Sequence, residues 1–331
     1  MKACVIGAGA WGIALAIVLS DTGFQVEMWD SDPAVTDAIN SQHIALKLQG
    51  LEIPLSIAAR HEAGQTLQGA SIVVSAVPSV ALGTVTRSLG PLIPGDAILV
   101  SATKGLDPET GKRPTEAWLS CGPSLGPKLV AMSGPNFAIE IARRLPAATV
   151  VASKSEEARE TAQAAFMTPY LRVYTHWDVA GVELGGALKN IIAIACGITE
   201  GMGIGYNAQA AIISRGIAEV TRLGSALGAD PLTFAGLSGV GDLVLTSTGH
   251  LSRNRQAGIA VGRGESIESF LARTGYTVEG VATVKSAMEL AKDHGISMPI
   301  TEVVYKILYL GLSTRQGLTE IMGRDRRSEH E

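Results

Sequence analysis

A lysine inside an apolar segment is the residue of this sequence that most directly indicates acid–base chemistry. Lys189 lies in the run 182–196, whose apolar residues repeat with a helical period. Its helical neighbours Gly185, Gly186 and Ala193 predict a face almost without side chains, where another molecule can lie beside the lysine. A partly buried lysine can exchange a proton with a substrate oxygen. The alternative is a lysine that snorkels out of a buried helix, and the two helix-weakening glycines argue against it.

A second cluster combines positive charge with the start of a helix. Ser252 is a favourable N-cap, and Arg253 and Asn254 follow it in the first turn. The planar guanidinium of arginine and the free N–H groups of a helix N-terminus both suit a phosphate. From these residues alone, a phosphate site and an exposed basic cap both stay open.

Two acidic residues have more than one interpretation each. Asp242, after Gly239-Val240-Gly241, either orients Lys189, accepts a hydrogen bond from a substrate hydroxyl, or is an N-cap. Glu279 either caps a helix or contacts a cofactor. The six histidines and three cysteines show no metal-ligand spacing, so we expect no metal site.

The N-terminal segment predicts a dinucleotide site. The motif Gly7-Ala8-Gly9-Ala10-Trp11-Gly12 follows a short apolar run, 2–6, and opens the apolar helical run 13–19. In this context Gly7 permits a tight turn, Gly9 leaves room for a pyrophosphate, and Gly12 lets helix and strand pack closely. The first helical turn offers N–H groups to the phosphates. The alternative is a glycine-rich turn without a ligand.

The next strand, 25–29, ends in a cofactor-selecting position. Asp30 and Asp32 follow it, and an acid at this distance from the glycines commonly accepts hydrogen bonds from the adenine ribose. They are equally consistent with solvated turn acids, since Asp32-Pro33 is a helix-start signal. Two carboxylates around Ser31 would repel the 2′-phosphate of NADP, so we expect NAD to be favoured over NADP.

The remaining elements predict two domains. Near-continuous apolar runs at 70–77, 97–101 and 129–132 indicate strands covered on both faces, and 147–152 and 171–175 extend that sheet. Pro78, Lys104 and Gly134 fall at carboxyl ends of these strands, where such sheets bind ligands. After Trp177 helical patterns take over, at 182–196, 207–227, 231–237, 252–261, 278–293 and 299–310. We therefore expect a Rossmann-type, mostly parallel α/β domain over 1–177 and an all-α domain over 178–331.

Composition limits the partners. At 331 residues, 46% hydrophobic and with a net charge of −4, the chain holds a sizeable core and no basic tract, which argues against nucleic acid. The scattered, odd-numbered cysteines favour reduced thiols in a cytoplasmic protein, and the chain enters its first strand without a signal peptide. The uncharged stretch 69–86 is interrupted by Pro78, and the apolar run 191–198 is too short to span a bilayer. A homodimer stays open.

In its whole length the chain resembles the bacterial NAD(P)-dependent sn-glycerol-3-phosphate dehydrogenases. The resemblance rests on Gly7–Gly12 with Trp11, Ser101-Ala102-Thr103-Lys104-Gly105-Leu106, Ser133-Gly134-Pro135-Asn136-Phe137-Ala138, Ala187-Leu188-Lys189-Asn190, 239–243 and Ser252-Arg253-Asn254, in this order. It implies reversible hydride transfer between dihydroxyacetone phosphate and glycerol 3-phosphate, which supplies phospholipid synthesis.

The resemblance also implies roles for individual residues. Lys189 is then the catalytic acid/base, and the substrate is lined by Lys104, Gly134, Asn136, Lys189, Asp242, Ser252, Arg253 and Asn254. The cofactor is contacted by Gly7, Gly9, Ala10, Trp11, Gly12, Asp30, Ser31, Lys104, Ala138, Arg253 and Glu279.

The chain departs from the family pattern at four places. Ala10 replaces the usual serine, and Asn136 replaces serine or threonine. Ser31 replaces an arginine found in many members, and 42–50 lacks the usual Tyr-Leu-Pro-Gly, and both bear on cofactor preference. A β-hydroxyacid dehydrogenase, which also pairs a Rossmann domain with a helical domain and a lysine, is the alternative enzyme. A nicotinamide-binding regulator without turnover is the alternative outside enzymes.

Overall fold

One sheet organises the first half of the chain in the computed structural model, which describes residues 1–48 and 50–324. Its eight strands follow the order β10-β9-β8-β7-β6-β1-β2-β5 within the described residues. The strands are β1 (Lys2–Ile6), β2 (Gln25–Trp29), β5 (Ile57–Arg60), β6 (Ile72–Ser75), β7 (Ile98–Ser101), β8 (Leu129–Ser133), β9 (Ala147–Ala152) and β10 (Leu171–His176). The segment between β2 and β5 adds α2 (Pro33–Asp37) and the short strands β3 (Ile44–Ala45) and β4 (Leu51–Glu52).

The direction of the strands creates the ligand-binding edge. The six strands from β5 to β8 are parallel, whereas β9 pairs antiparallel with β8 and parallel with β10. Because β1 has β2 on one side and β6 on the other, the strand order reverses at β1. The glycine motif follows β1, so it lies at this switch point, where open α/β sheets bind dinucleotides.

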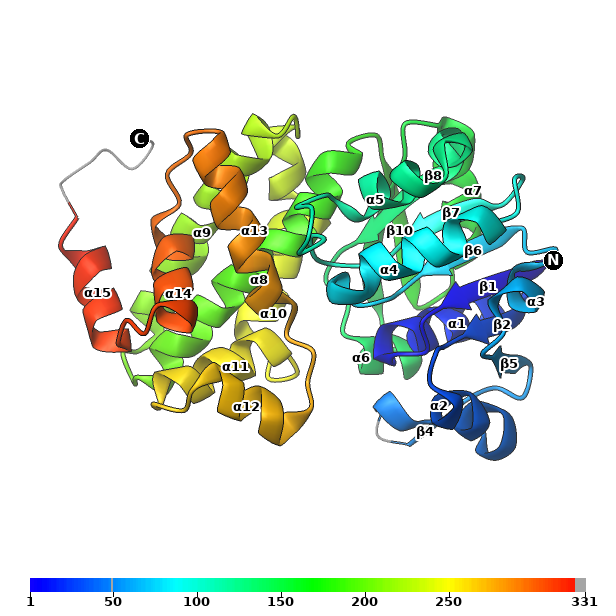
Figure 1. The fold of residues 1–331 in the computed structure, drawn as a ribbon, viewed down its shortest axis with the longest axis horizontal. Helices are drawn as coiled ribbons and strands as arrows, with labels where there is room; N and C mark the ends of the chain where they lie inside the picture. Colours follow the sequence, from blue (N-terminus) through cyan, green and yellow to red (C-terminus); the bar gives the residue numbers. More distant parts are fainter. Residues whose placement is uncertain (49, 325–331) are drawn as a thin grey trace.

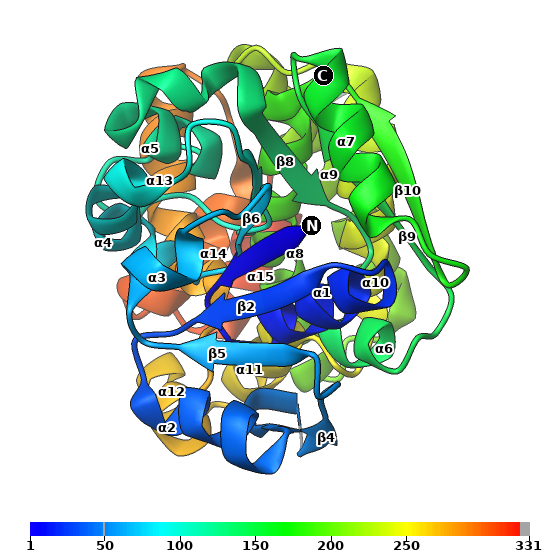
Figure 2. The ribbon, with the colours of Figure 1, turned by 90° about the vertical axis from the view of Figure 1, so that its right-hand side faces the viewer.

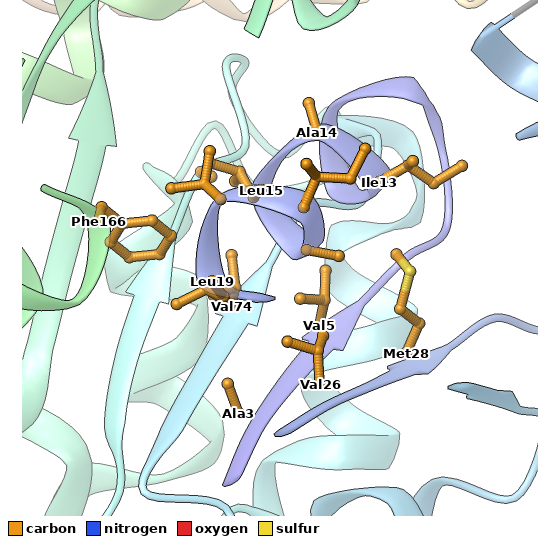
Figure 3. Packing of buried hydrophobic residues seen from close by; sticks show 14 of the residues in the cluster. Ala3, Val5, Ile13, Ala14, Leu15, Leu19, Val26, Met28, Val74 and Phe166 are labelled. Carbon is orange, nitrogen blue, oxygen red and sulfur yellow. The ribbon is translucent and has the colours of Figure 1, made fainter. Parts of the chain in front are cut away.

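Helices cover both faces of the sheet (Figure 2). On one face, α1 (Ala10–Asp21), α6 (Ala138–Ala142) and α7 (Glu156–Phe166) share a hydrophobic core with the strands. On the other face, α4 (Ser79–Leu89) and α5 (Pro114–Cys121) do so, next to α3 (Ala63–Leu67). Figure 3 shows Ile13 and Leu15 of α1 over Val5, Val26 and Met28 of the strands. This two-sided burial explains the continuous apolar strands of the sequence.

The second half of the chain is helical and surrounds α8 (Val179–Gly201) (Figure 1). The other helices are α9 (Tyr206–Ala226), α10 (Asp242–Thr248), α11 (Arg253–Gly262), α12 (Ile267–Thr274), α13 (Glu279–Asp293), α14 (Pro299–Tyr309) and α15 (Thr314–Met322). In the described part of the chain, α8 is the one helix long and apolar enough to cross a membrane, and 89% of that apolar stretch is buried inside the protein. Its character is therefore that of a core helix.

Close backbone contact joins α8 to α11. A Cβ atom on Gly197 would overlap the carbonyl oxygen of Arg255, and one on Gly258 would overlap the carbonyl oxygen of Ile194. Gly201 and Gly262 repeat this arrangement one turn further along. The four glycines let the two helix backbones touch, which fixes where α11 begins relative to the middle of α8.

The predicted fold class is confirmed, and the errors concern short elements. The strands β5, β3 and β4 and the helices α10, α12 and α15 were not predicted. The predicted helix 231–237 is a short 3₁₀ turn, Pro231–Ala235, followed by a π turn, Leu237–Gly241. The domain division after residue 177 stays a proposal; it falls between β10 and α8. Residues 325–331 lie outside the described residues, as does residue 49 of the atypical segment 42–50.

Candidate active site

The centre of the site is the buried ammonium of Lys189. Its side chain leaves α8 and is only 6% exposed. Nζ donates hydrogen bonds to Oδ1 of Asp242 and, at 2.6 Å, to Oγ1 of Thr246. The pKa of Lys189 is lowered from 10.5 to about 8, chiefly by burial. The charge of Asp242 acts in the opposite direction and raises this pKa, whereas the charge of Lys104 contributes to lowering it. Lys189 thus has a proton that it can give and recover near neutral pH.

Asp242 joins this lysine to a second one from the other domain. Lys104 follows β7, and its Nζ donates to Oδ2 of Asp242 at 2.9 Å and to the carbonyl of Gly134 at 2.7 Å. The same Nζ lies 5.7 Å from the centre of the Trp11 ring. The N-cap interpretation of Asp242 is wrong, because Gly241 occupies the N-cap of α10 and Asp242 follows it. Its carboxylate instead orients two ammonium groups.

The glycine pair before Lys189 has a different role from the predicted one. We expected Gly185 and Gly186 to leave room for another molecule. A Cβ on Gly185 would lie 2.5 Å from the carbonyl oxygen of Ser238, and one on Gly186 would overlap Oγ of Ser133. The space beside α8 is therefore filled by the protein itself. The glycines allow α8 to pack closely on the end of β8 and on the π turn, which brings Lys189 to the domain junction.

The loop after β8 lies next to these lysines. Gly134 has φ +140°, and a Cβ there would come within 3.1 Å of the Cα of Thr149. Asn136 donates from Nδ2 to the carbonyl of Ala148 at 3.0 Å, while its Oδ1 is buried without a hydrogen-bond partner. A buried carbonyl oxygen without a partner is costly, so it is a natural acceptor for a ligand hydroxyl.

The start of α11 presents a cation. Ser252 is the N-cap of α11 and accepts from the backbone N–H of Arg255 at 3.1 Å, which confirms that part of the prediction. Arg253 is exposed, and its guanidinium carbon lies 5.1 Å from the centre of the Tyr276 ring. Arg253 is thus held over an aromatic ring, with the N–H groups of the first turn beside it.

The side chain of Asn254 points into the protein, whereas that of Arg253 is exposed. Its Nδ2 donates to Oδ1 of Asn190 at 3.0 Å, and its Oδ1 accepts from the backbone N–H of Gly280 at 2.9 Å. The side chain is 8% exposed and ties α11 to α8 and α13. A substrate contact of Asn254 stays a prediction, restricted to its second amide hydrogen and its backbone N–H.

The glycine motif fits a dinucleotide. Gly7 has φ +97°, a Cβ on Gly12 would overlap the carbonyl oxygen of Gly7, and a Cβ on Gly9 would meet no atom within 4 Å. Close packing at Gly7 and Gly12 and open space at Gly9 match the roles expected of the motif. The N-cap of α1 makes no side-chain hydrogen bond, and Ala10 begins the helix. The buried Nε1 of Trp11 has no partner either.

The acids after β2 have separate structural roles. Asp30 accepts from the backbone N–H of Ala8 at 2.7 Å and thereby supports the glycine motif. Asp32 is the N-cap of α2 and accepts from Ala34 at 2.9 Å, so the helix-start interpretation is confirmed for it. Ser31 between them is exposed. A ribose contact of Asp30 and Ser31 stays a prediction.

Glu279 caps a helix, but in the other domain. It accepts from the backbone N–H of Ser79 at 3.2 Å and from its hydroxyl, at the start of α4. Burial raises the pKa of Glu279. The carboxylate therefore links α13 to the end of β6, beside the glycine motif, and a cofactor contact of Glu279 stays a prediction. Ala138, for which the resemblance also implies a cofactor contact, is the first residue of α6.

Two site residues were missed in the sequence. Thr246 contacts Lys189 and lies four residues after Asp242 on α10, a spacing that places both on one helix face. Asn190 follows Lys189 and donates from Nδ2 to the carbonyl of Lys104 at 3.0 Å. Had α10 been predicted as a helix, Thr246 would have been expected on the same face as Asp242. Nothing in the sequence indicates that Asn190 contacts the carbonyl of Lys104.

Metal ligands do not gather in the part of the chain that the structure describes. There, no group of three or more His, Cys, Asp or Glu side chains is arranged to hold an ion.

Comparison with known proteins identifies the family. The N-terminal model of NAD-dependent glycerol-3-phosphate dehydrogenase matches residues 2–159, and the C-terminal model matches residues 178–319. A protein of Symbiobacterium thermophilum named glycerol-3-phosphate dehydrogenase (NAD(P)+) is 44% identical over 331 residues, which cover 100% of this chain and 96% of that protein. The chain belongs to the NAD-dependent glycerol-3-phosphate dehydrogenase family.

Solved structures agree with this assignment. The crystal structure of glycerol-3-phosphate dehydrogenase from Coxiella burnetii has a TM-score of 0.92 at 33% identity and covers 98% of this chain and 99% of its own. A ketopantoate reductase from Ralstonia eutropha has a TM-score of 0.60 at 17% identity over 96% of this chain and 100% of its own. At that identity the likeness shows a shared fold alone, so the β-hydroxyacid alternative gains no support over the glycerol-3-phosphate dehydrogenase family.

Proposed function

We propose that the chain is an oxidoreductase that interconverts dihydroxyacetone phosphate and sn-glycerol 3-phosphate with NAD(H) or NADP(H). The observation that carries the proposal is the buried Lys189 ammonium, held by Asp242 and Thr246 at the junction with the dinucleotide-binding half. The name of the Symbiobacterium relative, which is similar over the full chain, states the same class of reaction.

In this mechanism Lys189 is the general acid. The glycine motif would hold the dinucleotide, whose nicotinamide would supply hydride chemistry for the ketone carbon. As the carbonyl oxygen gains negative charge, the ammonium of Lys189 stabilises it and donates a proton; in the oxidation the neutral amine accepts that proton. Because the pKa of Lys189 is about 8, both forms are populated near neutral pH. Asp242 and Thr246 hold Nζ in one direction throughout.

The substrate phosphate is assigned to the start of α11. Arg253 offers a planar guanidinium, and Ser252 is the N-cap of a helix whose first turn offers N–H groups. At the other end of the substrate, Lys104 and the partnerless Oδ1 of Asn136 are suited to its oxygens. Binding the remote phosphate positions the carbonyl for reaction, which lowers the barrier to the chemical step.

We infer NAD(H) as the favoured cofactor. Asp30 and Asp32 place two carboxylates around Ser31 at the end of β2, and a 2′-phosphate would be repelled there. Arg60, opposite Trp29 at the end of β5, is a cation on the neighbouring strand, and its Nε lies 3.5 Å from Oε2 of Glu27. We also propose that the protein is cytoplasmic and that its product supplies phospholipid synthesis. We further propose a homodimer, which light scattering on the purified protein tests.

The decisive experiment is an assay of NADH oxidation with dihydroxyacetone phosphate. Wild-type protein should turn over this ketone, and Lys189→Ala should lose about 10²–10⁴-fold in kcat while its affinity for NADH is unchanged. Acetoacetate, an unphosphorylated β-ketoacid, serves as the control substrate. Turnover of acetoacetate alone would favour the β-hydroxyacid alternative, and no turnover of any ketone would favour a nicotinamide-binding regulator. Normal kcat in Lys189→Ala would remove the lysine from the mechanism.

A further inference from the structure

A buried glutamate on the catalytic helix connects the two domains. Glu183 lies on α8, six residues before Lys189, or about 9 Å along the helix axis. It is 6% exposed. Its carboxylate accepts from the backbone N–H of Thr115 at 2.7 Å, from the Thr115 hydroxyl at 2.7 Å and from the Arg113 guanidinium at 2.9 Å. These donors lie at the start of α5, which packs on the sheet of the dinucleotide-binding half.

Glu183 belongs to a stripe of α8 that faces that half. Gly186 and Asn190 follow it at i+3 and i+7, so the three residues share one helix face. A Cβ on Gly186 would overlap Oγ of Ser133 at the end of β8, and Asn190 donates to the carbonyl of Lys104. Every one of these contacts reaches the end of a strand or the start of a helix in the first domain.

The adjoining stripe of α8 faces the second domain and carries the proton donor. Gly185 packs on the carbonyl of Ser238, and Lys189, at i+4 from it, donates to Asp242 and Thr246 on α10. The helix is therefore fixed to one domain by the first stripe and to the other by the second. Any slip of the first stripe moves Lys189 relative to Lys104 and to the glycine motif.

We propose that Glu183, through Thr115 and Arg113, is a positioning residue that sets where Lys189 stands relative to the dinucleotide-binding half. It does not touch Lys189, and its carboxylate is occupied by α5. A buried carboxylate that needs three donors is costly to place and costly to leave unpaired, so the helix has one favoured position against α5. Displacement of a reacting group by about 1 Å costs about 100-fold in rate, so such a contact affects turnover from a distance.

The chain contains a matched control. Glu219 of α9 is also buried, at 2% exposure, and accepts from the backbone N–H of Ile300 at 2.6 Å and from the hydroxyl of Thr301 at 3.1 Å. Like Glu183, Glu219 accepts backbone N–H and hydroxyl hydrogen bonds at the start of another helix, although the guanidinium partner is particular to Glu183 in these contacts; α9 and α14 both belong to the second domain. A purely stabilising role would make the two glutamates equivalent.

The test compares Glu183→Gln with Glu219→Gln, and it rests on the proposed function. Both variants should lower the melting temperature. Only Glu183→Gln should lower kcat for dihydroxyacetone phosphate, by about tenfold to 100-fold, with a smaller change in KM and an NADH affinity within about twofold of wild type. Its basic pH limb should also move away from about 8, since the distance from Lys189 to Lys104, whose charge lowers the Lys189 pKa, then changes.

The outcomes separate the two proposals. Equal kcat in both variants and in wild type would overturn the positioning role and leave Glu183 a structural residue. Absence of turnover in the wild type would instead overturn the proposed function. If Glu183→Gln does not fold, Thr115→Val removes the hydroxyl donor and keeps the backbone N–H, with Thr301→Val as its control. A kcat lowered in Thr115→Val alone supports the role, and an unchanged kcat in both refutes it.

Discussion

Replacing Asp242 by asparagine tests the electrostatics of the site most directly. The carboxylate is 1% exposed and contacts both Lys189 and Lys104. At an effective dielectric of 20 and a separation of 4 Å, a unit-charge pair contributes about 4 kcal/mol, equivalent to about three pH units of pKa. Relaxation and water entry reduce this value, so we expect the pKa of Lys189 to fall from about 8 to below about 7 in Asp242→Asn.

The sign of the effect on activity follows from the role of the lysine. Ketone reduction requires the ammonium, so kcat falls as pH rises through the pKa of Lys189, near 8 in the wild type. In Asp242→Asn this limb should lie at least one pH unit lower, and reduction at pH 8 should be about fivefold or more slower, because a smaller fraction of Lys189 is then protonated. Oxidation of glycerol 3-phosphate requires the amine, so its rising limb should shift in the same direction.

The assay is kcat at saturating NADH and dihydroxyacetone phosphate between pH 5.5 and 9.5, in buffers of constant ionic strength. Lys104→Met is the control of opposite sign, because loss of that neighbouring charge should raise the pKa of Lys189. A basic limb that stays near pH 8 in both variants would refute the assignment of Lys189 as the titrating acid.

Two further predictions concern the ligands. Arg253→Ala should raise KM for dihydroxyacetone phosphate at least tenfold, with a much smaller defect on unphosphorylated dihydroxyacetone, because a guanidinium–phosphate hydrogen bond contributes about 1.5–3 kcal/mol; equal losses on both ketones contradict a phosphate-binding role. The ratio of kcat/KM for NADH over NADPH should exceed about ten, since about 1.4 kcal/mol of charge repulsion suffices, and Ser31→Arg should reduce it. A wild-type preference for NADPH would show that the acids after β2 do not select the cofactor.

Local sequence patterns are sufficient to predict the fold class, the position of the dinucleotide and several helix starts. The continuous apolar runs specify a sheet buried on both faces, and the glycine motif at the end of the first run specifies where a dinucleotide enters, because both signals depend on residues close together in the chain. Lys189 could be singled out for a similar reason. A buried charge in an apolar helix costs free energy, so its presence there indicates a function. The N-cap roles of Ser252 and Asp32 are equally local.

Tertiary structure alone decided what each polar group contacts. Gly185 and Gly186 mark a close approach in the sequence, but only the folded chain shows that Ser238 and Ser133 fill it. For Glu279 the sequence left capping and a cofactor contact open, and only the folded chain shows that it accepts from the backbone N–H of Ser79, 200 residues earlier.

The same holds for the groups around the lysine. Asp242 joins Lys189 and Lys104 across separations of 53 and 138 residues, and Glu183 reaches Thr115 across 68. Periodicity and capping patterns extend over a few residues, whereas these hydrogen bonds depend on how α8 settles between the sheet and α10. The sequence therefore indicated Lys189, Lys104 and Asp242 as candidates, whereas the packing of α8 against two domains brought them together and added Thr246 and Asn190.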